Sequence, residues 1–221
     1  MISRCEGVGL VSGLTFDDGP NGATTSRLLD FLLSRDIRAV FCVIGSSIQS
    51  PGGSALLRRM VAEGHLLANH STSFADMGDW SPAAVRADLV ENLGIIRDAL
   101  GDPSAVVPYF RAPNGSWGVT EAVASDLGMR SLAVINAIED WVTQDRDQLV
   151  GNLREAMRPG ELVLAHDGGG DREATVDAVI QVVTERLADG WSFTLPKPAS
   201  PELLSLSADE NDHNSGLGVD G

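Results

Sequence analysis

The feature that most constrains the fold of this chain is an alternation, repeated about seven times, between short apolar runs and longer amphipathic segments. Glycine, proline or a cluster of polar residues separates each run from the next segment. The short runs are rich in valine and leucine, whereas apolar residues in the longer segments recur every three or four positions. Strands that alternate with helices in this way form a parallel sheet with crossover helices. The pattern therefore predicts an α/β fold.

The same punctuation places the individual elements. Ser81 followed by Pro82 is a strong helix start, because serine caps a helix well and proline suits its first position. Thr24 or Thr25 is predicted to cap the first helix. The predicted strands cover residues 8–16, 37–44, 65–69, 106–110, 131–136, 162–165 and 192–195. The predicted helices cover residues 24–36, 54–64, 82–100, 120–127, 145–157 and 174–189.

The chain is predicted to form one domain, residues 1–198, followed by a tail, residues 199–221. A length of 221 residues suits a single α/β barrel, and neither an internal repeat nor a second domain is visible. The tail is polar, acidic and rich in glycine, so it cannot bury enough apolar surface to offset the entropy lost on ordering it. We expect a disordered tail, and we expect deletion of residues 200–221 to change the melting temperature by only a few degrees.

Charge and cysteine content limit the partners and the compartment. The chain has 31 acidic and 16 basic residues and a net charge of −15, which argues against nucleic acid and anionic membranes as partners. No stretch approaches the ~18 apolar residues that cross a bilayer. Two isolated cysteines and the absence of a signal-peptide pattern predict a cytoplasmic location. The expected partner is a small soluble substrate.

An acidic turn follows the first predicted strand, in Thr-Phe-Asp-Asp-Gly-Pro at residues 15–20. Its carboxylates, Asp17 and Asp18, repel each other, so burying both is costly unless a cation or hydrogen-bond donor compensates. A site exploits such a pair when one carboxylate binds a metal and the other acts as a base. The alternative is a solvated acidic turn.

Polar side chains also follow four later strands. His70 comes after the third strand, Arg111 after the fourth and Asp140 after the fifth, while His166 closes the sixth. One histidine at a strand end is more often structural than catalytic. Acids, two histidines and an arginine at the ends of successive strands are harder to dismiss, because a barrel brings those ends together. This placement favours an incomplete or distorted (β/α) barrel over an open sheet.

The order and spacing of these motifs resemble those of the polysaccharide deacetylase family, also called the NodB-homology or carbohydrate esterase family 4. The resemblance extends from about Leu14 to Leu195, and the Thr-Phe-Asp-Asp-Gly-Pro motif is intact. It implies a distorted (β/α)7 barrel that removes an N-acetyl group. Hydrolysis of an acetamide needs an activated water, a Lewis acid at the carbonyl oxygen and a proton for the leaving nitrogen.

The resemblance also assigns the catalytic roles. It implies that Asp17 is the general base, supported by Arg111, and that His166 is the general acid for the leaving amine. It implies that Asp18 and His70 bind a divalent metal. Aspartate and histidine donors suit zinc or a similar ion.

Four further residues are predicted to bind the substrate. By resemblance, Leu164 and Trp141 line the pocket for the acetyl group. The backbone N–H of Asn114, where the family usually has tyrosine, helps to form the oxyanion hole. Asp140 is grouped with these residues as substrate-binding.

Two positions depart from the family pattern. The family has a histidine or an acid four residues after the first metal-binding histidine, and here that position is Phe74, which cannot bind a metal. The family aspartate that steadies the arginine is replaced by Ala137. Catalytic zinc sites usually have three protein ligands, so a metal here is expected to be weakly bound or absent.

Three hypotheses about function follow. The leading one is a hydrolase that removes an N-acetyl group from a soluble amino sugar, oligosaccharide or sugar-bearing metabolite. The second is a metal-independent enzyme, such as an isomerase or cyclase, that uses Asp17 and His166 as an acid–base pair. The third is a non-catalytic carbohydrate-binding protein, which would need neither proton-transfer residue.

Overall fold

The computed structural model describes residues 1–197, so the predicted tail of residues 199–221 lies outside the described residues. The strands are β1 Val11–Asp17, β2 Val40–Val43, β3 Leu66–Asn69, β4 Tyr109–Phe110, β5 Arg130–Ser131, β6 Glu161–His166 and β7 Ser192–Phe193. The helices are α1 Gly22–Ser34, α2 Gly45–Gln49, α3 Gly53–Ala62, α4 Pro82–Leu100, α5 Thr120–Asp126, α6 Arg146–Ala156 and α7 Glu173–Ala188, with a 3₁₀ turn, η1, at Pro113–Gly115.

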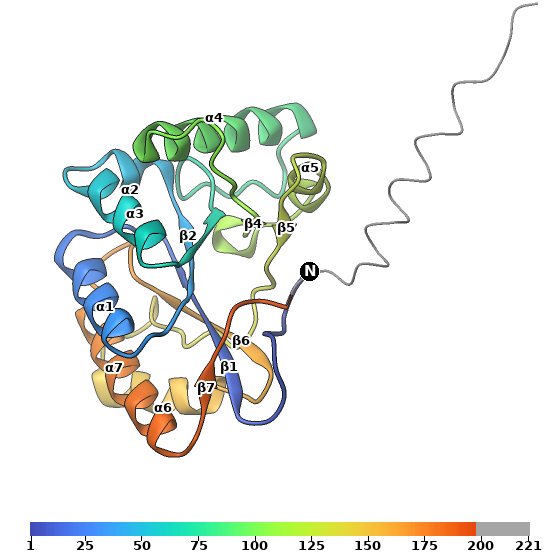
Figure 1. Cartoon of the computed structure of the whole chain (residues 1–221). Helices are drawn as coiled ribbons and strands as arrows, with labels where there is room; N and C mark the ends of the chain where they lie inside the picture. The colour runs from blue at the N-terminus through green and yellow to red at the C-terminus, as the bar shows by residue number, and fades with distance from the viewer. Residues whose placement is uncertain (198–221) are drawn as a thin grey trace, which may run out of the picture.

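The strands form one curled parallel sheet in the order β5-β4-β3-β2-β1-β6 (Figure 1). The central strand, β1, pairs with β6 along most of its length and with β2 at its C-terminal half. The last strand, β7, pairs with the N-terminal half of β1. The arrangement confirms the predicted α/β class and the distorted barrel.

The gap between β5 and β6 is spanned by irregular chain, which is where the barrel is distorted. Ala137 bridges Leu164 of β6 beyond the end of β5. Residues 2–4 also lie between the two strands, where Ile2 bridges Leu132 just after β5 and Arg4 bridges Glu161 at the start of β6. The segment after β5 therefore takes a strand's place beside the C-terminal half of β6.

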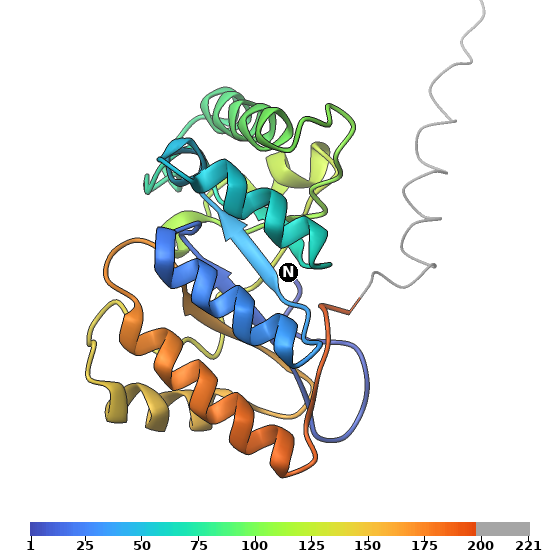
Figure 2. The ribbon, with the colours of Figure 1, turned by 60° about the vertical axis from the view of Figure 1, so that its left-hand side comes forward.

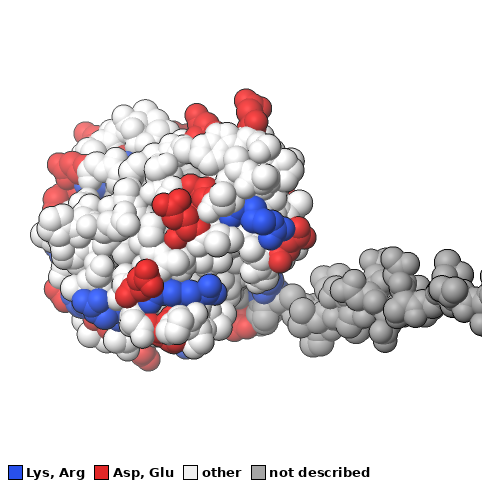
Figure 3. All heavy atoms as spheres, turned by 90° about the horizontal axis from the view of Figure 1, so that it is seen from above, with Lys and Arg blue, Asp and Glu red and all other residues white. Residues whose placement is uncertain are grey.

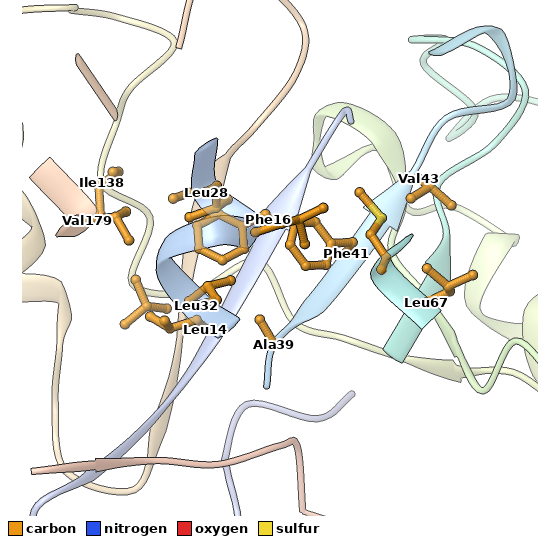
Figure 4. Close-up of a cluster of buried hydrophobic side chains, with 14 of the residues drawn as sticks. Leu14, Phe16, Leu28, Leu32, Ala39, Phe41, Val43, Leu67, Ile138 and Val179 are labelled. Carbon is orange, nitrogen blue, oxygen red and sulfur yellow. The ribbon is translucent and has the colours of Figure 1, made fainter. Parts of the chain in front are cut away.

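The helices pack on the outside of the sheet and enclose a large apolar core (Figures 1 and 2). All seven residues of β1 are buried, because helices and barrel interior cover both of its faces. Phe16 of β1 stacks on Phe41 of β2 with ring centroids 5.4 Å apart, and Leu28 of α1 packs beside them (Figure 4). This packing fixes β1 at the centre of the molecule.

Several predicted boundaries need correction. The Ser81 cap of α4 is confirmed, since its hydroxyl accepts the N–H of Ala84 at 3.3 Å. The predicted Thr24 or Thr25 cap is wrong, because α1 begins at Gly22 and both threonines lie inside it. The short helix α2 was not predicted. Strands β4 and β5 have only two residues each, because their pairing with neighbouring strands stops there.

The face of the molecule seen in Figure 3 has no large patch of a single charge. Acidic and basic side chains lie in small groups separated by neutral surface there. Within residues 1–197, no helix is both long enough and apolar enough to cross a bilayer.

Candidate active site

A cavity of about 440 Å³ opens at the C-terminal ends of the strands. Asp17, the last residue of β1, lies in register with Cys42 of β2 on one side and with His166 of β6 on the other. Parallel strands end at the same edge, so residues from distant parts of the chain meet here. The cavity is lined by Asp17, Asp18, His70, Phe74, Ala112, Asn114, Gly115, Val134, Trp141, Leu164, His166, Gly169 and Arg172. Two of the predicted site residues, Arg111 and Asp140, lie behind this wall.

Asp17 forms a buried ion pair with Arg111. The Arg111 Nη1 atom donates to Asp17 Oδ1 at 2.6 Å and to Thr15 Oγ1 at 2.9 Å, and Nη2 donates to the Ala133 carbonyl at 3.2 Å. Burial raises the pKa of Asp17, but the positive charge of Arg111 outweighs it and lowers the pKa overall, with smaller contributions from His70 and His166 in their protonated forms. Asp17 is therefore an ionised carboxylate at neutral pH.

Arg111 itself retains one unused donor. Its Nε atom is buried and has no hydrogen-bond partner among residues 1–197. The family places an aspartate at position 137 to steady this arginine, and an alanine supplies no acceptor.

The ring of His70 is held in the orientation of a metal ligand. Its Nδ1 atom lies 2.7 Å from the Arg111 carbonyl oxygen, which can only accept, so we assign the proton to Nδ1. The Nε2 atom then directs its lone pair toward Asp18 Oδ1 at 3.4 Å and Asp17 Oδ2 at 3.7 Å. A backbone carbonyl that fixes the tautomer in this way is typical of metal-binding histidines.

The donors present fit a divalent ion with only two protein ligands, Asp18 and His70. Phe74, at the position where the family pattern has a third donor, lines the cavity and supplies no ligand atom. Asp76 does not line the cavity, and its carboxylate accepts the side-chain amide of Asn114 at 2.9 Å. No group of three or more His, Cys, Asp and Glu residues is placed to hold a metal in the part of the chain that the structure describes. Water or substrate would complete the coordination.

His166 is fixed by Asp140, which is itself fully buried. His166 Nδ1 donates to Asp140 Oδ1 at 2.7 Å, and the His166 backbone N–H donates to Oδ2 at 2.9 Å. Burial lowers the pKa of His166, but the Asp140 hydrogen bond and charge, with the charges of Asp17 and Asp18, raise it overall. The prediction that Asp140 binds substrate is wrong, because its carboxylate lies behind His166 and does not reach the cavity.

The backbone and the side chain of Asn114 have different surroundings. Its backbone is left-handed, with φ 55° and ψ 15°, a conformation that asparagine tolerates better than most residues. Its side-chain amide donates to the Phe74 carbonyl at 3.1 Å and to the Asp76 carboxylate at 2.9 Å. The residue therefore holds the loop that carries Phe74. A role for its backbone N–H as an oxyanion donor stays a prediction.

The remaining predicted residues form the apolar wall. Trp141 packs edge-on against the His166 ring, with centroids 5.5 Å apart and planes at 75°. Leu164, two residues before His166 in β6, lines the same wall together with Val134 and Ala112. The placement is compatible with an acetyl pocket.

Sequence reasoning missed the glycine-rich loop after β6. A Cβ on Gly168 would lie 2.2 Å from the Asp18 carbonyl oxygen, and one on Gly169 would lie 2.4 Å from Asp18 Oδ2. Only glycine permits this loop to pack against Asp18. The three consecutive glycines at residues 168–170 were the available signal.

Asp167 and Arg172 were also missed. The Asp167 carboxylate is fully buried beside Gly19, and Thr25 donates to it. Burial, together with the charges of Asp18 and Asp17, raises the pKa of Asp167 to about 7 despite the Thr25 hydrogen bond. The side chain of Arg172 lines the cavity and bonds backbone carbonyls, which no side-chain motif could indicate.

Comparison with known proteins assigns the family. The family model for polysaccharide deacetylase matches residues 9–132. A chitooligosaccharide deacetylase from Bradyrhizobium sp. (strain ANU 289) is 36% identical over 188 residues, covering 83% of this chain and 82% of that protein. The chain belongs to the polysaccharide deacetylase family. This family contains hydrolases that act on N-acetyl amide bonds.

Two further proteins of known activity are similar to this polysaccharide deacetylase family member. A peptidoglycan-N-acetylglucosamine deacetylase from Bacillus cereus is 27% identical over 188 residues, covering 83% of this chain and 84% of that protein. Among solved structures, a family 4 acetyl xylan esterase from Clostridium thermocellum in complex with a cobalt ion superposes with a TM-score of 0.74. The two sequences are 27% identical, and the superposition covers 90% of this chain and 92% of the esterase chain.

Proposed function

We propose that the protein is a deacetylase that hydrolyses the N-acetyl group of an amino-sugar oligosaccharide. One observation carries the proposal: a carboxylate and an imidazole occupy matching positions on paired strands, Asp17 on β1 and His166 on β6. Each is anchored by a partner outside the cavity, Arg111 and Asp140 respectively. A fixed base beside a fixed acid suits a reaction that takes one proton and gives another.

Asp17 serves as the general base. The Arg111 ion pair keeps it ionised, and its Oδ2 atom faces the cavity side of the pair, 3.7 Å from His70 Nε2. A water bound beside it gives up a proton to the carboxylate as the water oxygen attacks the acetyl carbon.

His166 serves as the general acid. Its Nδ1 proton is committed to Asp140, so the Nε2 atom is the one available for proton transfer to the substrate. In the protonated ring Nε2 donates its proton to the amide nitrogen while the carbon–nitrogen bond breaks, which releases a free amine and acetate. The raised pKa of His166 favours that protonated form.

Asp18 and His70 are the residues that would hold a divalent metal. When bound, the metal supplies a Lewis acid for the carbonyl oxygen and lowers the pKa of a coordinated water. A two-ligand site predicts weak retention, because catalytic zinc usually has three protein ligands. The acetyl xylan esterase was solved in complex with a cobalt ion, which supports a bound divalent metal in this protein.

The apolar wall supports an acetylated sugar as substrate. Trp141 is 54% exposed and Phe74 is 46% exposed, although both are large apolar residues that line the cavity. Aromatic faces suit the C–H face of a pyranose ring and the acetyl methyl group. The names of the relatives from Bradyrhizobium and Bacillus cereus favour N-acetylglucosamine oligomers. We also propose that the substrate is soluble and encountered in the cytoplasm.

One observation favours a second function. With no three-residue ligand group in residues 1–197, Asp17 and His166 are also suited to metal-independent acid–base chemistry, such as isomerisation or cyclisation of a small metabolite.

Acetate release from N-acetylglucosamine oligomers tests the proposal. The purified protein is assayed as isolated, after chelator treatment and after addition of zinc or cobalt, and we expect chelator to abolish activity and metal to restore it. Asp17→Asn and His166→Ala should each lower the rate by about 10²–10⁴. Asp147→Asn, whose side chain is 94% exposed, is the control.

Three results would contradict it. Near-native rates in both site variants would exclude the assigned base and acid. Absence of acetate release from every acetylated amino sugar tested would exclude the deacetylase. Acetate release that survives complete metal removal would exclude a required metal.

A further inference from the structure

Arg172 is a charged group in the cavity wall to which the proposed mechanism gives no role. It directly precedes α7 and is only 8% exposed. Its Nε atom donates to the Gly168 carbonyl at 2.8 Å, Nη1 to the Asp140 carbonyl at 2.7 Å and Nη2 to the Gly169 carbonyl at 3.4 Å. Within residues 1–197 its partners are these carbonyls and not carboxylates. The guanidinium therefore ties three points of backbone together.

One of those points belongs to the residue that orients the general acid. The carboxylate of Asp140 accepts the Nδ1 proton of His166 on one oxygen, and on the other it accepts the backbone N–H of His166 and the hydroxyl of Thr175. The Asp140 carbonyl accepts from Arg172 and from Gln144 Nε2 at 2.7 Å. Because carboxylate and carbonyl are parts of one short residue, a displaced backbone displaces the carboxylate and with it the imidazole.

The loop around Asp140 has little regular structure to hold it. Residues 132–145 contain no helix or strand, and Glu139 is left-handed with φ 58°. The start of α7 supplies the missing support through Thr175 and the residue that precedes the helix, Arg172. A guanidinium suits this task because its planar fork presents several donors in fixed directions.

We propose that Arg172 is a positioning residue that holds the Asp140 backbone, so that Asp140 orients His166 for proton transfer. Its kinetic consequence rests on the proposed deacetylase function. Its structural consequence, a persistent hydrogen bond from His166 Nδ1 to Asp140, does not depend on the reaction.

Two variants and one matched control test the role. Arg172→Met removes all three hydrogen bonds, and Arg172→Lys keeps the charge but loses the fork. The control is Arg58→Met, since Arg58 Nη1 also donates to a backbone carbonyl, that of Ala99 at 2.6 Å, and does not line the cavity. The measurements are the NMR signal of the His166 Nδ1–H proton, kcat and KM on N-acetylglucosamine oligomers, and melting temperature.

We expect the Nδ1–H signal to be sharp in the native protein and in Arg58→Met, weakened in Arg172→Lys and lost by exchange in Arg172→Met. A misplaced catalytic group typically costs about 10²-fold in rate. We therefore expect Arg172→Met to lose about 10–10²-fold in kcat with KM changed by about twofold or less, and Arg172→Lys to fall between it and the native protein.

A folded Arg172→Met protein with the native Nδ1–H signal would overturn the inference. A lower melting temperature with an unchanged signal and kcat would show a merely structural role and would also overturn it. If Arg172→Met does not fold, the lysine variant decides, because a native signal and kcat in that variant would exclude the need for the fork. If the native protein releases no acetate, the proposed function fails and the NMR signal alone decides the positioning role.

Discussion

Asp17 and Arg111 are charged side chains almost entirely shielded from water, with exposed fractions of 3% and 1%. Removing one partner of a buried ion pair leaves an uncompensated charge and typically costs about 3–5 kcal/mol. The pair therefore keeps Asp17 ionised, and substitution of either residue should destabilise the folded protein. His166 is less enclosed, because its ring reaches the cavity. The protonation state of His166 can therefore change with pH more readily than that of Asp17.

The pH dependence of turnover should report the general acid. Because the folded environment raises the pKa of His166, the ring stays protonated to a pH above its ordinary value of 6.5 and loses its proton as pH rises further. We expect kcat/KM to fall about tenfold per pH unit beyond that point. Asp140→Asn, which removes the negative charge that helps to raise the pKa of His166, should move this limb to lower pH. An alkaline limb unchanged in Asp140→Asn would contradict the assignment.

Phe74 determines how many donors the metal site has. Phe74→His places an imidazole on the wall shared by Asp18 and His70, so we expect it to raise zinc affinity. A group that only hydrogen-bonds to a metal ligand contributes about 10–100-fold in metal affinity, and a third ligand should contribute at least as much. Phe74→Leu, which removes the ring without adding a donor, is the control. Equal zinc content in the two folded variants after dialysis against chelator would show that position 74 does not reach the metal.

At the scale of single elements, α4 is the support of the loop that carries His70. Its Asp88 carboxylate accepts the Ser71 hydroxyl at 2.6 Å and the backbone N–H of Thr72 at 3.2 Å. Its Asn92 donates to the Asn69 side chain at 2.8 Å, and Asn69 in turn donates to the carbonyl of Leu89 at 2.9 Å. These hydrogen bonds join α4 to the end of β3 and to the two residues after His70, and so fix the position of the chain on both sides of His70.

Asp88→Ala should destabilise the protein and loosen the metal site together. Loss of the carboxylate leaves the buried Ser71 hydroxyl without an acceptor, which costs about 1–3 kcal/mol. Urea denaturation measures the change, and zinc titration measures the site. Asp98→Ala, an exposed position on the same helix, should be close to neutral. Equal effects of the two substitutions would show that α4 does not support the His70 loop.

At the scale of the whole molecule, the polar site and a second buried histidine lie at opposite ends of the barrel strands. His65 precedes β3, whereas His70 follows it. His65 Nδ1 accepts the Ala39 N–H at 3.1 Å, and its ring packs edge-on against Phe41 at 5.1 Å. Burial, with a contribution from the charge of Arg59, lowers the pKa of His65 to about 4. The folded state therefore holds this histidine neutral.

The free energy of unfolding should decrease as the pH is lowered, because of His65. The unfolded chain binds a proton at His65 below about pH 6.5, whereas the folded protein does so only below about pH 4, so stability is lost as pH falls between these values. The total from this group is about 3 kcal/mol. His65→Gln cannot titrate, so the stability difference between native protein and variant should shrink toward pH 4. A difference independent of pH would show that His65 is not held neutral.

The layout of the barrel and most of the residues of the site could be predicted from the amino-acid sequence alone. Alternating runs predict parallel strands, and the C-terminal ends of parallel strands share one edge, so Asp17, Asp18, His70 and His166 had to lie near one another. The start of α4 could also be predicted, because the Ser81 cap and Pro82 stabilise the first turn of the helix that directly follows them in sequence. Such features depend on neighbours along the chain or on strand direction alone.

The groups that anchor the site side chains could not be predicted from the sequence and became visible only in the folded chain. The partner of His166 is 26 residues away in sequence, and that of Arg172 in the same loop is 32 residues away. The carbonyl that fixes the His70 tautomer and the three carbonyls bound by Arg172 belong to the backbone, which is the same at every residue type. A sequence pattern records side chains, so acceptors of this kind become visible only when the folded chain brings them within hydrogen-bond distance.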